Sequence, residues 1–456
     1  MAKYKAYPEY KDSGVEWLGE IPTHWDCTAL KRLCSLITGL TPPTQNEDNY
    51  ADEGYPWVRP EDLNVSGFGT RASKYVSDIG WKLLRHIKPH STLICCIGTI
   101  GKCGYVNETV STNQQITAAT FRDSERFNYY LLQAARAQLE ELATGNVLKI
   151  LNSERLGALN VVKVNCKEAN TIAEFLDHQT AKIDNLIDKQ QQLIELLKEK
   201  RQAVISHAVN KGLNPDVPMK DSGVEWLGEV PEHWVVTRLK YLINTFEQGW
   251  SPLCETRLAD KYEYGVLKVG CVNSGEFNPL EHKALPSNLV PQKQYLVKKN
   301  DLLISRANTK ELVGSSAVIE KDYDNLILCD KLYRVRFRNS INPYFISEFI
   351  RTPVIRKQIE LSASGASHSM QNIGQDTIKE LFIALPPENE ALQLVSFIKN
   401  EIDVFESLIG LSNRQVVLLQ ERRTALISAA VTGKIDVRDW VAPDTQDVEE
   451  SQEATT

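Results

Sequence analysis

The side chains of this sequence that could carry out chemistry rarely stand at the spacings that chemistry requires. The nine cysteines form no C-x-x-C pair, and neither they nor the eight histidines stand at the spacing of zinc ligands. Gly98-Thr-Ile-Gly-Lys102 lacks both the spacing and the hydroxyl of a phosphate-binding loop. Neither an adenine-methylation motif, (N/D)PP(Y/F), nor a nuclease-type carboxylate cluster is found. We therefore expect no catalytic residues, no cofactor-binding residues and no metal site in this chain.

The bulk composition is typical of a soluble protein with two or three domains, since 456 residues are 42% apolar and 24% charged. The N-terminus MAKYKAYPEY lacks the apolar stretch of a signal peptide, so we expect a cytoplasmic protein with reduced thiols. The net charge is −7, but five acidic residues between 444 and 453 account for all but about −2 of it. A near-neutral body can still present a basic face to nucleic acid.

One stretch of the chain occurs twice. Residues 11–25 read KDSGVEWLGEIPTHW and residues 220–234 read KDSGVEWLGEVPEHW, so only two positions differ. Such identity indicates an internal duplication. The repeated stretch contributes His24, His233 and four tryptophans, and we interpret these as structural or partner-facing anchors, because a shared scaffold cannot carry differing specificity. The tryptophans are Trp17, Trp25, Trp226 and Trp234.

Each copy of the repeat introduces short β-type segments separated by Gly and Pro, which predicts a mixed sheet domain. The second domain replays parts of the first: the loop Gln248–Pro252 matches Thr38–Pro42, and the strand-like Asp301–Ser305 matches Thr92–Cys96. Beyond these short matches the two domains hardly resemble each other.

Each domain is followed by a long stretch with the pattern of a coiled-coil helix, about residues 167–209 and 387–431. Gly212 and Gly433 are placed to end the two helices. The residues predicted to pair the helices are Ile172, Leu176, Ile183, Leu186, Leu193, Leu197 and Val204 in the first, and Leu394, Ile398, Phe405, Leu408, Leu419 and Leu426 in the second. Further apolar positions, Ile187, Ile194, Ile205, Ile409, Val416 and Ile427, widen the stripe and leave room for a second packing surface.

The duplicated order predicts that the two helices pack antiparallel about a pseudo-twofold axis, with a sheet domain at each end of a rod of roughly 60 Å. In that pairing we expect Lys200 near Glu401 and Gln179 near Arg422. The predicted fold class is α+β, with two mixed α/β domains separated by two long antiparallel coiled-coil helices. The predicted segments are a first domain at 1–166, a central helix at 167–213, a second domain at 214–386, a distal helix at 387–434, and a partial repeat with an acidic tail at 435–456.

Two divergent domains on a shared spacer suit a protein that reads two separate targets. On DNA, a spacer of this length sets the two domains more than one helical turn of about 34–36 Å apart. Specificity usually resides in loops that a shared scaffold holds in place.

The repeat KDSGVEWLGEIPxHW, the GxxP loop after the first strand, and the order domain–helix–domain–helix resemble the specificity subunit (HsdS) of type I restriction–modification systems. The resemblance covers nearly the whole chain except the acidic tail. It implies two target recognition domains that read an asymmetric bipartite DNA site, with two modification (HsdM) subunits, and restriction (HsdR) subunits in the full complex. It also implies that S-adenosylmethionine, ATP and Mg²⁺ belong to the partner subunits, in the cytoplasm of a bacterium or archaeon.

The residues expected to contact DNA are polar or basic side chains in the loops of the two domains, because Arg and Lys suit guanine and phosphate, and Asn and Gln suit adenine. In the first domain they are Thr41, Thr44, Arg59, Arg71, Lys74, Asn113, Gln114 and Gln115. In the second they are Trp250, Ser251, Arg257, Lys268, Asn273, Arg306, Asn308, Lys310, Ser367 and His368. The strand end that runs into Arg306–Lys310 is the strongest of these segments.

Two alternatives come from other classes of protein. A coiled-coil scaffold or adaptor would need no DNA, but it leaves the paired divergent domains unexplained. A self-contained methyltransferase or nuclease is disfavoured by the missing motifs.

Overall fold

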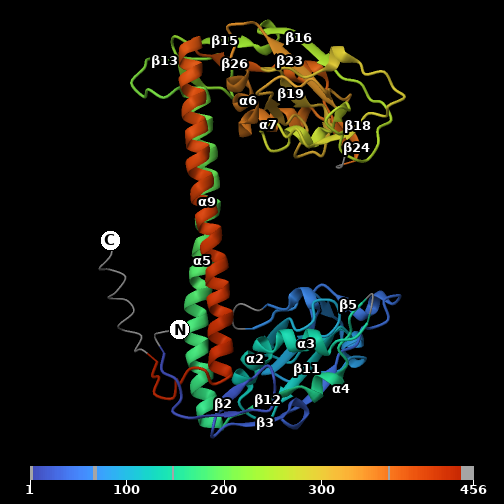
Figure 1. The fold of residues 1–456 in the computed structure, drawn as a ribbon, viewed down its shortest axis with the longest axis vertical. Coiled ribbons are helices and arrows are strands. Elements are labelled where there is room, and N and C mark those ends of the chain that lie inside the picture. The colour runs from blue at the N-terminus through green and yellow to red at the C-terminus, as the bar shows by residue number, and fades with distance from the viewer. Residues whose placement is uncertain (1–3, 65–68, 146–147, 368–369, 443–456) are drawn as a thin grey trace. The chain divides into compact units, whose positions relative to one another are not determined.

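The computed structural model describes residues 4–64, 69–145, 148–367 and 370–442, which form two compact units. Unit 1 comprises Met1–Gln192 and Ser412–Thr456, and unit 2 comprises Leu193–Leu411. Both boundaries fall inside the long helices α5 (Cys166–Lys211) and α9 (Glu388–Val431), so each helix contributes one half to each unit (Figure 1). The segments predicted from the sequence instead treat each long helix as separate from the sheet domains.

Unit 1 is built on an antiparallel sheet with the strand order β4-β11-β8-β9, whose inner face packs against α2. A second sheet has the order β10-β6-β7-β5, in which β6 and β10 are parallel. The strands are β1 (Tyr10–Asp12), β2 (Glu20–Pro22), β3 (Asp26–Ala29), β4 (Cys34–Thr38), β5 (Tyr50–Ala51), β6 (Tyr55–Val58), β7 (Tyr75–Val76), β8 (Ser91–Cys95), β9 (Cys103–Val106), β10 (Ser111–Thr112), β11 (Ile116–Phe121) and β12 (Asn160–Lys163). The short helices are α1 (Asp78–Lys82), α2 (Glu125–Ala134), α3 (Arg136–Leu142) and α4 (Ser153–Ala158).

Unit 2 repeats this plan with β16-β23-β19-β21 as its main sheet and β18-β17-β22 as its second sheet, in which β17 and β22 are parallel. A third sheet, β20-β25-β24, is described with the candidate site below. The strands are β13 (Met219–Asp221), β14 (Glu229–Pro231), β15 (Val235–Arg238), β16 (Ile243–Gln248), β17 (Gly265–Leu267), β18 (His282–Ala284), β19 (Leu302–Ser305), β20 (Ala307–Asn308), β21 (Ser316–Val318), β22 (Leu326–Ile327), β23 (Leu332–Phe337), β24 (Ser364–Ser367), β25 (Met370–Asn372) and β26 (Phe382–Leu385). The short helices are α6 (Pro343–Arg351), α7 (Pro353–Ser362) and α8 (Gln375–Lys379).

The matching loops after the first long strand of each domain have a common steric cause. A Cβ on Gly39 would lie 2.2 Å from the carbonyl oxygen of Thr112, and a Cβ on Gly249 would lie 2.2 Å from that of Leu328. Since such contacts are far inside van der Waals distance, only glycine lets the loop approach its neighbour. The second sheet in each unit is thereby closed against the main sheet by the same device.

The duplicated stretch fastens the first turn of a long helix to the sheet domain. In unit 1 the carboxylate of Glu168, on α5, accepts hydrogen bonds from Trp25 Nε1 at 3.0 Å and Tyr7 OH at 2.8 Å, and it lies 2.9 Å from His24 Nε2. In unit 2 the carboxylate of Glu390, on α9, meets Trp234 and His233 in the same way. The sequence interpretation of these His and Trp residues as structural anchors agrees with this geometry.

The unit 1 joint is the more enclosed of the two. Glu168 is only 6% exposed, and Asn165 Nδ2 adds a further hydrogen bond at 2.9 Å. Burial and the bond to Glu168 raise the pKa of Tyr7 well above its usual range, so its hydroxyl remains a proton donor. Glu390 has a side chain that is 28% exposed and receives only the two contacts of the repeat.

Both long helices end on these joints. Gly433 and Gly212 adopt left-handed backbone angles, with φ near 75° and 77°, as glycine does at helix ends. A Cβ on Gly433 would lie 2.3 Å from Pro22 Cδ, and one on Gly212 would lie 3.5 Å from Trp234 Cζ2. In each unit the duplicated stretch therefore contacts the start of one long helix and the end of the other.

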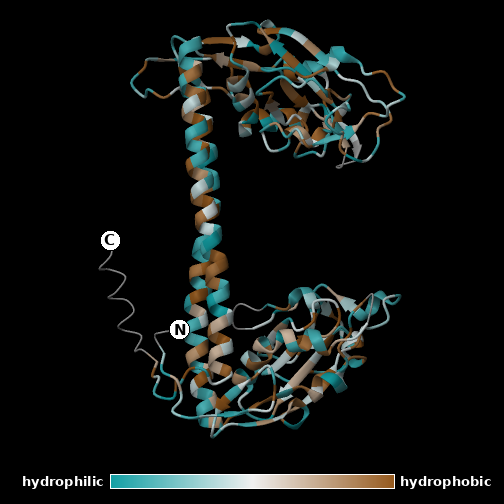
Figure 2. Cartoon of the chain, viewed as in Figure 1, coloured by the Kyte–Doolittle hydropathy of each residue, from teal (hydrophilic) through white to brown (hydrophobic). Residues whose placement is uncertain are grey.

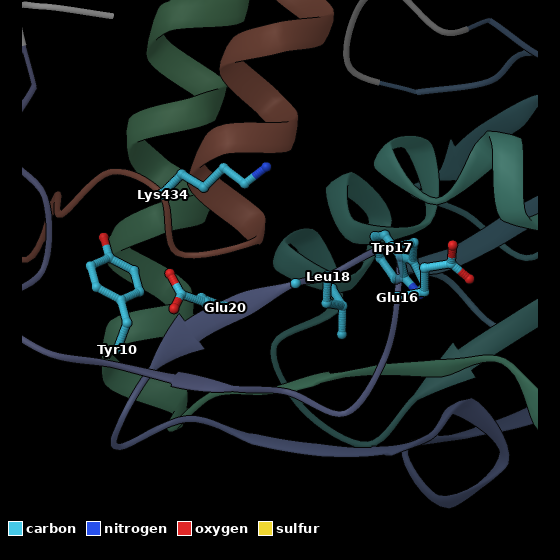
Figure 3. Close-up of a pocket in the computed structure, with 7 residues that line it drawn as sticks. Tyr10, Glu16, Trp17, Leu18, Glu20 and Lys434 are labelled. Carbon is cyan, nitrogen blue, oxygen red and sulfur yellow. The ribbon is translucent and has the colours of Figure 1, made fainter.

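In unit 1 the beginning of the chain and the segment after α9 complete the joint together. The amide of Asp436 donates to the carbonyl of Lys5 at 2.8 Å, and Tyr10 OH donates to the carbonyl of Gly433 at 3.1 Å. A pocket of about 390 Å³ opens there, lined by Tyr10, Glu16, Trp17, Leu18, Gly19, Glu20 and Lys434 (Figure 3). The partial repeat after α9 thus packs where a continuous chain would have supplied the missing segment.

The seam between the long helices runs one residue later than predicted along one of its two lines. Thr180, Ile187, Ile194 and Ala208 are buried at seven-residue multiples, whereas Leu186 and Leu193 are 48% and 42% exposed. In α9, Leu394, Ile398 and Phe405 are buried, but Leu408 is 41% exposed. The prediction that Leu186, Leu193 and Leu408 pair the helices is therefore wrong. A leucine and an isoleucine stand side by side at these places, and the apolar pattern alone does not say which faces inward.

Ion pairs fix the register of the helices. Asp184 pairs with Arg423 at 2.9 Å inside unit 1, and Arg201 pairs with Glu406 at 3.7 Å inside unit 2. Both pairs of residue numbers add to 607, and the offset of 222 residues that relates the two helix sequences converts one pair into the other. The predicted neighbours, Lys200 with Glu401 and Gln179 with Arg422, add to 601. That register is wrong by six residues.

No helix within the described ranges carries an apolar stretch of the length that crossing a bilayer requires.

We predict that reversing either charge of the Asp184–Arg423 pair destabilises the protein by about 1–3 kcal/mol, because both side chains are largely buried and each reversal leaves like charges together. The variants Asp184→Lys and Arg423→Glu combined should recover much of that loss in a double-mutant cycle measured by urea denaturation. Arg201 and Glu406, which are more exposed, should show coupling below about 1 kcal/mol. Coupling between Lys200 and Glu401, with none between Asp184 and Arg423, would contradict the register.

Candidate nucleic-acid interface

In unit 2 half of the residues predicted to contact nucleic acid gather around one small sheet. This sheet, which we call the amide ribbon, consists of β20, β25 and β24 in the order β20-β25-β24. Asn308 lies on β20 and Ser367 on β24, while Arg306 and Lys310 flank β20. Asn273 joins them through a hydrogen bond to Asn308, and the predicted contact His368 lies outside the described residues.

The amide ribbon begins where a buried strand of the main sheet ends. β19 is buried throughout, and the next residue, Arg306, donates its amide to the carbonyl of Lys331 at 2.8 Å. The carbonyl of Arg306 accepts the amide of Ile373, just beyond β25, at 3.0 Å. The Arg306 side chain is partly exposed and forms no hydrogen bond or ion pair with any residue in the described ranges. Its positive charge is therefore available to a ligand.

The polar side chains of the ribbon are oriented by one another. Asn308 Nδ2 donates to Asn273 Oδ1 at 2.9 Å, and Asn308 Oδ1 accepts the amide of Thr309 at 2.9 Å. In the strand register Asn308 stands opposite Gln371, and Ala307 stands opposite Asn372. Amides that are positioned in this way can donate and accept hydrogen bonds at base edges in a groove of DNA.

Other predicted residues of unit 2 are committed elsewhere. Arg257 forms ion pairs with Glu255 at 2.8 Å and with Glu263 at 2.5 Å, and its hydrogen bond holds the pKa of Glu263 down at about 2. Lys268 forms an ion pair with Glu281 at 2.9 Å. Trp250 packs partly buried against an apolar core. These contacts neutralise or cover the groups, while Ser251 is exposed on the neighbouring loop.

In unit 1 the predicted residues meet at the ends of the parallel strands β6 and β10. Arg59 follows β6, and the amide of Asn113, which follows β10, donates to the carbonyl of Val58 at 3.2 Å. Thr41 donates to Gln114 Oε1, which ties the GxxP loop to the same place. The ends of parallel strands collect loops at one edge of a sheet, and this explains why segments distant in the sequence converge here.

Asn113 does not fit its predicted role. It is only 8% exposed, its Nδ2 donates to Gln115 Oε1 at 2.9 Å, and its Oδ1 accepts the amide of Gln115. An asparagine before a turn commonly bonds to the backbone in this way. The side chain therefore shapes the loop that presents Gln114, and the prediction that it contacts DNA is not supported by its geometry.

The basic residues of unit 1 differ in how free they are. Arg59 pairs with Glu61 at 2.9 Å and reaches Ser73 at 3.3 Å. Arg71 and Lys74 are exposed and have no ion-pair partner within the described ranges, and Thr44 is exposed on the GxxP loop. Arg71 and Lys74 are thus the members of the set best able to approach phosphate.

Sequence reasoning missed Gln371 and Asn372 on β25, and Arg85, which donates to the carbonyl of Thr38 at 2.8 Å beside the GxxP loop. The consecutive amides of Gln371-Asn372 were a visible signal, but their partner strand lies more than 60 residues away. No group of three or more His, Cys, Asp or Glu residues suited to a metal ion occurs within the described ranges.

The duplication, the two unlike polar surfaces and the shared scaffold agree with a comparison against known families. The family described as "Type I restriction modification DNA specificity domain" matches residues 22–196 and again residues 231–413, which together make up most of the chain. The chain belongs to this family. The resemblance drawn from the sequence is confirmed, and the DNA specificity reading is supported over that of a scaffold protein.

Individual relatives agree with the family. The type I restriction enzyme EcoKI specificity subunit of Escherichia coli (strain K12) is 22% identical over 93% of this chain and 92% of that protein. The EcoEI specificity subunit of Escherichia coli is 30% identical over 219 residues, which are 48% of this chain but only 36% of that protein.

A solved structure confirms the fold class of the specificity family for this chain. A chain from work on complex assembly and conformational transition of the type I restriction–modification system matches with a TM-score of 0.68 at 14% identity. The match covers 90% of this chain and 98% of that chain. The α+β architecture with long helices and a pseudo-twofold repeat is confirmed.

We predict that two arginines of unit 2 of this DNA specificity protein differ sharply in their effect on DNA binding. Arg306→Ala should lower affinity about tenfold and reduce the slope of log K against log salt by about one, because an unpaired arginine can neutralise a phosphate. Arg257→Ala should change affinity less than about twofold, since three acidic neighbours already neutralise it. Mobility-shift titrations at several salt concentrations measure both. Equal losses from the two variants would remove Arg306 from the interface.

Proposed function

We propose that this chain is the DNA-binding specificity subunit of a type I restriction–modification complex. Each unit reads one half of an asymmetric bipartite site, and the long helices set the gap between the half-sites. The chain directs adenine methylation or restriction that partner subunits carry out in the cytoplasm of a bacterium or archaeon. The observation that carries this proposal is the presence of two DNA specificity domains on one chain with unlike candidate contact surfaces.

The surfaces differ as two readers of different half-sites should. Unit 2 offers the amide ribbon with Arg306, whereas unit 1 offers Gln114 beside Arg59 and Lys74 at the ends of β6 and β10. The 46 residues of α5 make a helix about 69 Å long at 1.5 Å per residue, which exceeds one turn of DNA.

We propose further that the chain is not catalytic by itself. S-adenosylmethionine, ATP and Mg²⁺ are assigned to two modification subunits and to the restriction subunits of the full complex. The contribution of this chain is to choose the DNA sequence at which those subunits act.

The test is a methylation map. The full chain, co-expressed with its modification subunit in cells that lack other adenine methylation, should mark one bipartite sequence. Purified together, the two proteins should shift DNA that contains this sequence in preference to a scrambled one. Methylation without the chain, or a complex that binds all sequences alike, would reject the proposal and favour a scaffold role.

The outer faces of the long helices suit two copies of one helical partner. Leu186 and Leu418 in unit 1 are 48% and 62% exposed, and the 222-residue offset maps them onto Leu408 and Leu196 in unit 2, which are 41% and 61% exposed. Hydrophobic residues are interspersed with hydrophilic ones along both helices (Figure 2). Exposed leucines duplicated at equivalent positions favour duplicated docking sites.

We predict that Leu186→Lys combined with Leu418→Lys reduces the number of bound modification subunits from two to one, because a lysine at the centre of an apolar contact would be buried unpaired. Native mass spectrometry of the reconstituted complex gives the stoichiometry directly. Leu253→Lys, at a site 90% exposed in a loop of unit 2, is the matched control and should leave two subunits bound. Two bound subunits in the double variant would place the docking surface elsewhere.

A further inference from the structure

Both units carry a short hairpin at the same place in their topology, between the second domain helix and the strand that leads to a long helix. In unit 1 Thr144 bridges Ile150, and Ile150 also bridges Ile97, which follows β8. In unit 2 Ser364 pairs with Asn372, and Asn372 also pairs with Ala307, which follows β19. The three positions correspond one to one.

The scaffold of the two hairpins is the same at its tightest point. A Cβ on Gly145 would lie 2.1 Å from the carbonyl oxygen of Leu148, and a Cβ on Gly365 would lie 2.2 Å from that of Met370. Neither position admits another residue without a shift of the backbone. Each glycine follows a small hydroxyl residue, Thr144 or Ser364, at the start of the hairpin.

The side chains presented on this shared scaffold differ in chemistry. The bridges align Ile150 of unit 1 with Asn372 of unit 2, and hence align Lys149 with Gln371 and Gly98 with Asn308. The apolar residues Leu148 and Met370 are both 53% exposed. A common backbone that carries different groups at exposed positions is the arrangement expected of an element that determines specificity.

The side chains of unit 2 match one base better than the others. Gln371 and Asn308 stand directly opposite on neighbouring strands, so their side chains share one end of the ribbon. Asn308 is held by Asn273 and by the amide of Thr309, and it thereby supports Gln371 from a fixed position. A side-chain amide bonds N6 and N7 of adenine together, and a β-ribbon fits the major groove in which those atoms are exposed.

We propose that these hairpins are the base-reading elements of the two units and that Gln371 on β25 recognises an adenine in the half-site of unit 2. Asn308 is its positioning residue, and Arg306 and Lys310 contact the adjacent phosphates. The recognition element consists of the described residues 364–367 and 370–372 with β20. This assignment rests on the proposed function and names the residue through which unit 2 exercises it.

The test uses the full chain with its modification subunit and a library of DNA in which both half-sites are varied. Gln371→Ala should lower the preference for adenine at one position of one half-site by about ten- to hundredfold and leave the other half-site unchanged. Gln371→Glu, which nearly preserves shape, should move the preference at that position toward cytosine, because a carboxylate accepts from N4 of cytosine. Gln294→Ala, at an exposed glutamine of unit 2 outside the ribbon, is the matched control.

The outcomes are distinguishable. An unchanged adenine preference in both Gln371 variants, or an equal loss in both half-sites, overturns the assignment of Gln371 while the proposed function stands. A wild-type complex without any sequence preference overturns the proposed function as well. Asn308→Ala provides a second reading, because a positioning role predicts a weaker preference at the same single position, and a change at another position would contradict it.

Discussion

The structure depends on a carboxylate placed in the first turn of each long helix. Glu168 and Glu390 each receive the indole and imidazole groups of a duplicated His-Trp pair, and a carboxylate is favoured at that end of a helix by the backbone dipole. Removing either acid would leave buried donors without acceptors, which is costly. Because the glycine that ends the other helix packs against the same tryptophan, one small cluster fixes how each sheet domain is attached to both helices.

The duplicated sequence and the divergent sequences therefore do different physical work. Identity is retained where a side chain meets a fixed partner inside the unit, as Trp25 and Trp234 do, or where Gly39 and Gly249 allow a loop to approach its neighbour. Divergence falls on side chains that face outward from an unchanged backbone, such as Lys149 and Gln371. The protein can change what it binds at such positions without disturbing the helices, because the two sets of residues share few contacts.

The repeat, the α+β class and both long helices could be predicted from the sequence, since identity and the spacing of apolar residues carry that information directly. The register of the helices could not, because Leu186 and Ile187 are equally apolar neighbours and only the three-dimensional fit buries one of them. The candidate contacts were found as types rather than as a set. Asn113 has the right chemistry but is spent on its own loop, and Gln371 went unnoticed because its neighbour Asn308 comes from a strand 60 residues earlier.

The closure of unit 1 by both ends of the chain has a consequence for its synthesis. Unit 2 is continuous from Leu193 to Leu411, whereas unit 1 requires Tyr10 to meet Gly433 and Lys5 to meet Asp436. A chain emerging from the ribosome thus has all of unit 2 available before the last residues of unit 1 exist. The usual order, in which the N-terminal domain folds first, is inverted for the finished joint, and the first domain waits with its Tyr7–Glu168 cluster incomplete until translation is nearly over.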